Sequence, residues 1–178
     1  MITLTGFLRG INVGGHHKVP MAELRERLHE IGCNNVRTLL NTGNVMFETT
    51  QTNICELENT LEASISRSFG FPIPVILKTK KEISDLVDSN PFREIQIHQQ
   101  LRLYVSFLKD TPTFDLTTPY VSTDKSYQII HISNKTILSV LDLSASKTPK
   151  GMDELEKLFG KNITTRNWNT IKKINAIQ

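Results

Sequence analysis

Apolar residues in the first eighty positions recur at two spacings, which predict strands that alternate with helices. Alternating apolar and polar residues are typical of half-buried strands, whereas apolar residues three or four positions apart are typical of amphipathic helices. The predicted order is strand, helix, strand, strand, helix, strand, over residues 2–11, 20–31, 35–40, 45–49, 54–69 and 73–78. This is the order of the ferredoxin-like split βαβ unit, and right-handed crossovers give it the strand order 4-1-3-2.

Local signals mark several element ends. The run Asn41-Thr42-Gly43-Asn44 predicts a hairpin turn, because Gly and Asn tolerate positive φ. Asn53 and Thr79 are each followed three positions later by Glu, the spacing of a capping box at a helix start. Pro72 and Pro74 cannot donate to a sheet ladder, so the fourth strand is predicted to begin or lie at a sheet edge.

The pattern recurs in part in the second half of the chain. Strands are predicted over residues 101–108, 127–132 and 136–141, a helix over 152–159, and a weakly patterned segment compatible with a helix over 114–120. Where a fourth strand is due, Trp168, Ile171 and Ile174 recur at helical spacing instead. We therefore predict a final helix there, with Thr165 as its N-cap.

These patterns together predict an α+β fold built from two ferredoxin-like (βαββαβ-type) halves. In the second half, the last strand is predicted to be replaced by a helix. The predicted parts are a first half over residues 1–80, a linking helix and loop over 81–100, and a variant half over 101–178.

Composition bounds the classes of function. Hydrophobic residues make up 38% and charged residues 22% of the 178 positions, as in globular proteins. There is no apolar run of about 18 residues and no export signal at the N-terminus, so we expect a cytoplasmic protein with no membrane partner. Cys33 and Cys55 match no metal-ligand spacing and are expected to be free thiols, so neither a metal nor another cofactor is predicted. The net charge of +3 permits a nucleic-acid partner without indicating one.

Several short motifs are similar to those of one bacterial family. They are Leu8-Arg9-Gly10-Ile11-Asn12-Val13-Gly14-Gly15, Lys18-Val19-Pro20-Met21, Val36-Arg37-Thr38, Gly43-Asn44-Val45, Asn90-Pro91-Phe92 and Thr164-Thr165-Arg166-Asn167-Trp168. The chain thereby resembles the family known as domain of unknown function sixteen ninety-seven. The resemblance implies two ferredoxin-like halves and implies no activity. The chain departs from the family at Thr42, where Ser is usual, and over 144–149, where only Ser146 and Lys147 match.

The predicted topology brings the loop after the first strand and the turn at 41–44 to the same end of the sheet. The first helix also begins there, and its unpaired N–H groups and positive dipole end favour an anion. Glycines in the loop allow the backbone to approach a ligand closely, although their spacing is neither Walker A nor the dinucleotide fingerprint. We expect a phosphate-bearing or carboxylate small molecule, bound by Arg9, Gly10, Asn12, Gly14, Gly15, Lys18, Thr42, Asn44, Arg166 and Asn167.

Several of these residues also have a structural interpretation. Asn44 taken alone is explained by turn chemistry. Arginine in the first turn of a helix opposes the helix dipole, so Arg166 and Asn167 remain open between a site role and a structural one. Trp168 is interpreted as a core residue in preference to a base-stacking one, and His16 with His17 as part of a solvated loop.

Three function hypotheses remain open. The first is the anion site, with or without catalysis; no motif for a nucleophile, a metal protease or a carboxylate pair is present, so enzymatic activity is undecided. The second is a protein-interaction or self-association module that uses a sheet edge or the open sheet face. The third, nucleic-acid binding, is disfavoured because the third strand offers a single aromatic residue, Phe47, beside Glu48.

Overall fold

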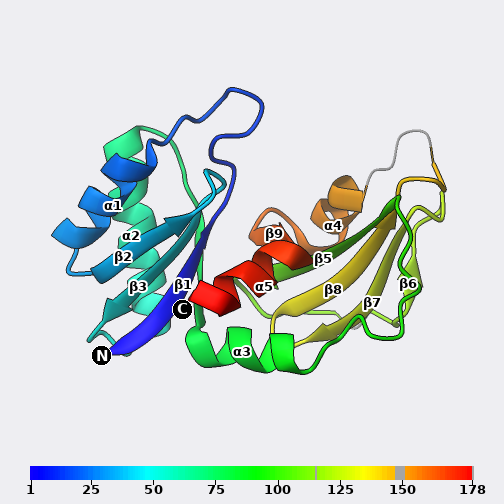
Figure 1. Cartoon of the computed structure of the whole chain (residues 1–178). Helices are drawn as coiled ribbons and strands as arrows, with labels where there is room; N and C mark the ends of the chain where they lie inside the picture. Colours follow the sequence, from blue (N-terminus) through cyan, green and yellow to red (C-terminus); the bar gives the residue numbers. More distant parts are fainter. Residues whose placement is uncertain (115, 147–150, 178) are drawn as a thin grey trace. The chain divides into compact units, whose positions relative to one another are not determined.

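The computed structural model describes every residue of the chain except 115, 147–150 and 178. It has a mixed α+β fold with two antiparallel sheets (Figure 1). The chain forms two compact units, one made of Met1–Asp85 and the chain from Ile174 onward, the other of Leu86–Lys173. The predicted fold class is confirmed.

The first unit has the predicted ferredoxin-like order. Its elements are β1 (Ile2–Leu8), α1 (Met21–Glu30), β2 (Asn34–Leu39), β3 (Asn44–Thr49), α2 (Ile54–Phe69), β4 (Val75–Thr79) and the start of α3 (Lys80–Asp88). The sheet order is β2-β3-β1-β4, which is the predicted order read from the other edge. Strand β4 is an edge strand and begins directly after Pro72 and Pro74, as the two prolines predict. Helices α1 and α2 lie on the same face of the sheet (Figure 1).

The core of this unit lies between the sheet and the two helices. It contains Leu4 and Leu8 from β1, Val45 and Phe47 from β3, and apolar residues of both helices. Leu24 and Leu28 of α1 and Leu57, Leu61 and Ile65 of α2 are buried, which is the face that the helical spacing predicts.

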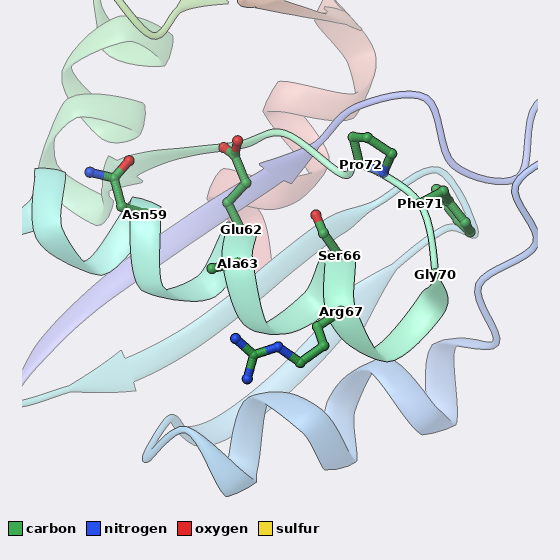
Figure 2. A pocket seen from close by; sticks show the side chains of 8 residues that line it. All are labelled: Asn59, Glu62, Ala63, Ser66, Arg67, Gly70, Phe71 and Pro72. Carbon is green, nitrogen blue, oxygen red and sulfur yellow. The ribbon is translucent and has the colours of Figure 1, made fainter.

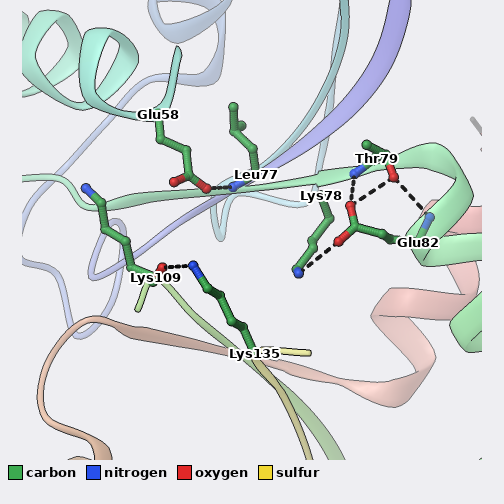
Figure 3. A network of polar contacts seen from close by, with 7 residues as sticks. All are labelled: Glu58, Leu77, Lys78, Thr79, Glu82, Lys109 and Lys135. Atoms are coloured by element: carbon green, nitrogen blue, oxygen red, sulfur yellow. Dashed lines mark hydrogen bonds and ion pairs between the residues drawn. The ribbon is translucent and has the colours of Figure 1, made fainter. Parts of the chain in front are cut away.

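One predicted capping box of the first unit forms in full, at Thr79, and the other forms in part, because Glu56 Oε2 accepts from the side-chain Nδ2 of Asn53 at 3.3 Å and not from its backbone N–H. The side chain of Asn53 accepts a hydrogen bond from the backbone N–H of Glu56 at 3.2 Å. At α3, the N–H of Glu82 donates to Thr79 Oγ1 at 3.1 Å, and the N–H of Thr79 donates to Glu82 Oε2 at 2.8 Å (Figure 3). Burial acts to raise the pKa of Glu82, but these hydrogen bonds and Lys78 Nζ at 3.0 Å outweigh it and lower that pKa.

The second unit carries a five-stranded sheet. Its elements are β5 (Leu101–Leu108), β6 (Tyr120–Val121), β7 (Tyr127–Ser133), β8 (Thr136–Asp142), α4 (Gly151–Phe159), β9 (Ile163–Asn167) and most of α5 (Trp168–Ile177). The sheet order is β6-β7-β8-β5-β9. Its core includes Leu108, Tyr127, Ile129, Ile137 and Leu155. The hairpin between β7 and β8 is where the sequence predicts it.

Two predictions for the second half are wrong. The last strand is present as β9, which pairs antiparallel with β5 from Leu108↔Ile163 to Tyr104↔Asn167, and the predicted helix follows it from Trp168. The sequence pattern does not indicate this strand, because the segment holds a single strongly apolar residue, Ile163. In addition, the described residues of 114–120 contain no helix and lead into β6. Pro112 precedes that segment and Pro119 lies within it, and proline disfavours a continuous helix.

The described part of the chain contains no helix that is long and apolar enough to cross a membrane. Nor does it bring three His, Cys, Asp or Glu side chains together as a metal site. Of the two residues that match the family within 144–149, Ser146 is described and Lys147 lies outside the described residues.

Candidate functional site

Three loops of the first unit meet at one end of its sheet, and we call them the three-loop end. They are the β1–α1 loop (residues 9–20), the β2–β3 turn (40–43) and the α2–β4 loop (70–74). The N–H of Leu8 donates to Gly43 O at 2.8 Å, and the N–H of Arg9 donates to Pro74 O at 3.0 Å. The predicted meeting of the β1–α1 loop with the 41–44 turn is therefore confirmed.

The β1–α1 loop forms a small β-ribbon. The N–H of Asn12 donates to His17 O at 3.0 Å, and the N–H of His16 donates to Val13 O at 3.1 Å. Gly14 and Gly15 form the two-residue turn between them, with φ of 60° and 79°. Two successive positive φ values are those of a type I′ hairpin turn, which favours glycine at both positions. The two glycines thus shape a projecting ribbon, and their conformation is explained without a ligand.

The side chain of Asn12 ties the base of this ribbon to the β2–β3 turn. Its Nδ2 donates to Val19 O at 2.9 Å and to Asn41 O at 2.8 Å, and its Oδ1 accepts from the N–H of Val19 at 2.9 Å. These three bonds use both ends of the amide group. Asn12 therefore positions the loop, and its side-chain amide is not directed at a ligand.

Asn44 and Gly43 hold the β2–β3 turn against β1. Asn44 is fully buried, and its Nδ2 donates to Leu39 O at 2.9 Å and to Thr42 Oγ1 at 3.2 Å. Gly43 has φ of 79°, and a Cβ there would lie 2.8 Å from the Cβ of Leu8. The turn-chemistry interpretation accounts for Asn44, and the hydroxyl of Thr42 accepts from it.

Basic side chains and an absence of acidic ones define the charge of the three-loop end. None of its three loops contains Asp or Glu, whereas the β1–α1 loop carries Arg9, His16, His17 and Lys18. His16, His17 and Lys18 are exposed and Arg9 is half-buried. The α1 helix begins beside them at Met21, and its N-cap residue Pro20 supplies no side-chain hydrogen bond. The positive end of α1 therefore adds to the positive charge of the loop.

His17 is held against the third loop. Its ring stacks on Phe71 with 4.4 Å between ring centroids and 15° between planes, and its Nδ1 lies 3.2 Å from Gly10 O. A shallow hollow of about 540 Å³ lies nearby on α2, lined by Glu62, Ser66 and Arg67 among others (Figure 2). Glu62 and Ser66 accept from the N–H groups of Val75 and Ile73 at 3.3 and 2.8 Å. These side chains support the α2–β4 loop, and the acid makes the hollow itself a poor anion site.

Arg166 and Asn167, the remaining predicted ligand residues, belong to the second unit. Arg166 lies on β9 and not in the first turn of a helix, so the dipole argument made for it is wrong. Its Nη1 donates to Thr164 Oγ1 and to Thr165 O, both at 2.8 Å, and burial lowers its pKa to about 10. Asn167, in place of Thr165, caps α5, because its Oδ1 accepts from the N–H of Asn169 at 2.9 Å. The Oγ1 of Thr165 instead pairs with Ser106 Oγ at 2.7 Å.

Comparison with known proteins gives a family and a fold. The family described as "Protein of unknown function (DUF1697)" matches residues 1–137. The chain belongs to this family. A solved structure, that of the conserved bacterial protein SP0830 from Streptococcus pneumoniae, is similar to it over 98% of this chain and 97% of that one. The TM-score is 0.69 at 22% sequence identity, which shows a shared fold. Comparison with the curated proteins gives no match.

In this DUF1697 chain, two of the motifs that carry the family resemblance meet within the second unit. Phe92 and Trp168 pack edge to face, with 5.3 Å between ring centroids and 62° between planes. Both line a cavity of about 650 Å³, to which Asn90 and Asn167 also contribute. This cavity was not predicted from the sequence. The one feature of the sequence that could have indicated it is that both motifs contain an asparagine close to an aromatic residue. Nothing in the sequence shows that the two motifs are close in space.

Proposed function

We propose that the first unit binds an anionic small molecule, phosphate-bearing or carboxylate, at the three-loop end. One observation carries the proposal: three braced loops contain four basic side chains and no acidic one. A cluster of basic side chains next to a helix N-terminus, in loops whose sequence contains no Asp or Glu, favours an anion. The structural bonds of Asn12 support this interpretation in a different way from the one first expected, since they fix the loop that carries the basic side chains. The bonds of Asn44 hold the uncharged turn beside that loop.

The basic residues of the β1–α1 loop that would contact the anion are those whose side chains reach solvent. Lys18 and His16 are the exposed side chains that would contact the anion, with Arg9 beside them at the end of β1. An exposed cation 4 Å from an anion contributes about 1 kcal/mol in water, so three such contacts give a dissociation constant on the order of 10 mM. Binding is therefore expected to weaken as the ionic strength rises.

A thermal-shift titration with pyrophosphate at constant ionic strength tests the proposal. We expect pyrophosphate to raise the melting temperature of the full chain and Lys18→Glu to remove that increase. Lys173→Glu is the matched control, because Lys173 is an exposed lysine of the second unit and the substitution changes the net charge equally. Equal loss in both variants, or no stabilisation of the unmodified chain by pyrophosphate, phosphate or citrate, would contradict the proposal.

One observation favours the protein-interaction hypothesis as a second candidate. Val13 at the tip of the ribbon is 64% exposed and Leu40 in the β2–β3 turn is 50% exposed, so two large apolar residues face solvent among the cations. A mass that rises with concentration in light scattering, and falls again in Val13→Ser, would support it. No comparable observation favours base stacking on β3, because Phe47 is 2% exposed within the core.

A further inference from the structure

The cavity of the second unit has a lining of unusual composition. Of its twelve lining residues, three are Arg or Lys, three are Asn and six are apolar, so none is acidic. Its volume of about 650 Å³ lies in the range of small-molecule sites, roughly 300–1,000 Å³. The loop before β5, the first residues of β5 and the start of α5 form its walls.

The three cations are Arg93, Arg102 and Lys172, and none is neutralised within a tight, buried ion pair. Arg102 Nη1 donates to the backbone carbonyls of Gln99 at 2.8 Å and Leu101 at 3.0 Å, which orient the guanidinium without cancelling its charge. Arg93 Nε lies 3.5 Å from Glu94, but both side chains are mostly exposed, so solvent screens that pair. Lys172 is exposed on α5.

An acid on the neighbouring strand β8, Asp142, is already engaged. Asp142 pairs with Leu101 across β8 and β5, and its carboxylate accepts from the N–H of Ser144 at 2.8 Å and lies 3.5 Å from His98. It is not among the lining residues. The cavity therefore keeps a net positive charge that a bound anion would balance.

The apolar part of the lining gives the ligand a second requirement. Phe92 and Trp168 are 3% and 6% exposed, whereas Ile97 is 67% exposed at the rim. Apolar side chains beside cations suit a molecule with both an apolar group and an anionic one, because burial of the apolar group stabilises binding and the charges fix the orientation of the molecule.

We propose that this cavity binds an organic anion that carries an apolar group, such as an aryl or acyl carboxylate or phosphate monoester. The site is separate from the three-loop end and does not depend on the function proposed there. Lys172 and Arg102 hold the anionic group, the asparagines Asn90 and Asn169 offer amide donors, and Ile97 with Trp168 contacts the apolar group.

The single tryptophan of the chain makes the test direct, because Trp168 lines the cavity. Phenyl phosphate is titrated into the full chain while Trp168 fluorescence and its indole N–H resonance are recorded together, so a ligand that leaves the fluorescence unchanged is still detected. We expect saturable binding of phenyl phosphate, and weaker binding of both phenol and inorganic phosphate. Phenol that binds as tightly as phenyl phosphate would overturn the proposal, as would no change in either signal up to about 10 mM, beyond which affinity is negligible.

Neighbouring residues supply a matched pair of variants. Lys172 lines the cavity and Lys173 does not, although both are exposed on α5. Lys172→Ala is expected to weaken phenyl phosphate binding about fivefold, the effect of about 1 kcal/mol for one exposed charge contact. Lys173→Ala is expected to leave the dissociation constant of phenyl phosphate within about twofold of its original value. Ile97→Ser changes an exposed apolar position, so it is expected to weaken phenyl phosphate binding without unfolding the chain. Equal effects of the two lysine variants would overturn the proposal, and loss in Lys18→Glu alone would assign the binding to the three-loop end instead.

Discussion

The side-chain amide of Asn12 donates to the backbone carbonyl of Asn41 across 2.8 Å, although 29 positions separate the two residues. This bond joins the ribbon after β1 to the turn between β2 and β3. The same amide group also makes two bonds to the backbone of Val19. Asn12 is thus the brace on which the geometry of the three-loop end depends.

Replacing Asn12 is expected to destabilise the first unit. Asn12→Ala removes three hydrogen bonds from a partly buried position, and we expect the free energy of unfolding to fall by about 1–3 kcal/mol. Urea denaturation measures it. Asn35→Ala is the control, because Asn35 has a similar positive φ, 51° against 55° for Asn12, and makes one exposed side-chain bond, to Glu48. The two variants share the backbone cost of alanine at positive φ, so Asn35→Ala should lower the free energy of unfolding by clearly less than Asn12→Ala does. Equal costs for the two variants would contradict the bracing role.

Gly43 is expected to resist substitution more strongly than Gly10. Both have positive φ, 79° and 72°, so alanine carries a backbone cost of about 1 kcal/mol at either position. At Gly43 the added Cβ would also lie 2.8 Å from Leu8 Cβ and 3.1 Å from Leu8 O, whereas Gly10 has open space around it. We expect Gly43→Ala to cost about 2–4 kcal/mol and Gly10→Ala about 1 kcal/mol in the same denaturation experiment. Similar costs would show that Gly43 is not closely packed on β1.

The two cysteines are expected to react at very different rates. Cys33 is buried, and burial raises the pKa of its thiol to about 11, whereas Cys55 is exposed. The thiolate is the reactive form, so a thiol reagent at neutral pH should label one site in the folded chain and two after denaturation. Cys55→Ser is expected to abolish the rapid labelling. Rapid labelling that persists in Cys55→Ser would place Cys33 at the surface.

Asp124 is expected to contribute to stability only above acidic pH. Hydrogen bonds from Ser122 Oγ at 2.7 Å and then from the N–H and Oγ of Ser126 lower its pKa to about 2, from 3.8. Because the folded-state pKa is the lower one, this contribution is present above pH 3.8 and is lost as the pH falls towards about 2. An NMR titration of the carboxyl carbon should give a midpoint at about 2. A midpoint at 3.8 would mean that the three bonds do not form in solution.

Local patterns predicted most of the fold because the interactions behind them are local. Asn53 with Glu56, and Thr79 with Glu82, lie three residues apart, so a capping box is visible in the sequence. The strand β9 depends on distant partners instead. Thr165, for example, pairs with Ser106 on β5, 59 positions away, and no spacing within Ile-Thr-Thr-Arg-Asn indicates that partner.

The meeting of the loops at the three-loop end was predictable, and the roles of their residues were less so. The strand order places the β1–α1 loop and the β2–β3 turn at one end, so their meeting followed from topology. The sequence could not show that the side-chain amides of Asn12 and Asn44 donate to backbone carbonyls, because asparagine side chains can also hydrogen-bond a ligand. The cavity in the second unit could not be predicted from the sequence, because its walls come from three separate segments.

A ¹H–¹⁵N titration of the full chain with pyrophosphate at constant ionic strength locates an anion bound at the three-loop end. We predict saturable amide shifts concentrated in residues 9–18 and 40–43, and their loss in Lys18→Glu. Shifts spread evenly over both units, or saturable shifts that leave these two loops unchanged, would contradict an anion site at the three-loop end.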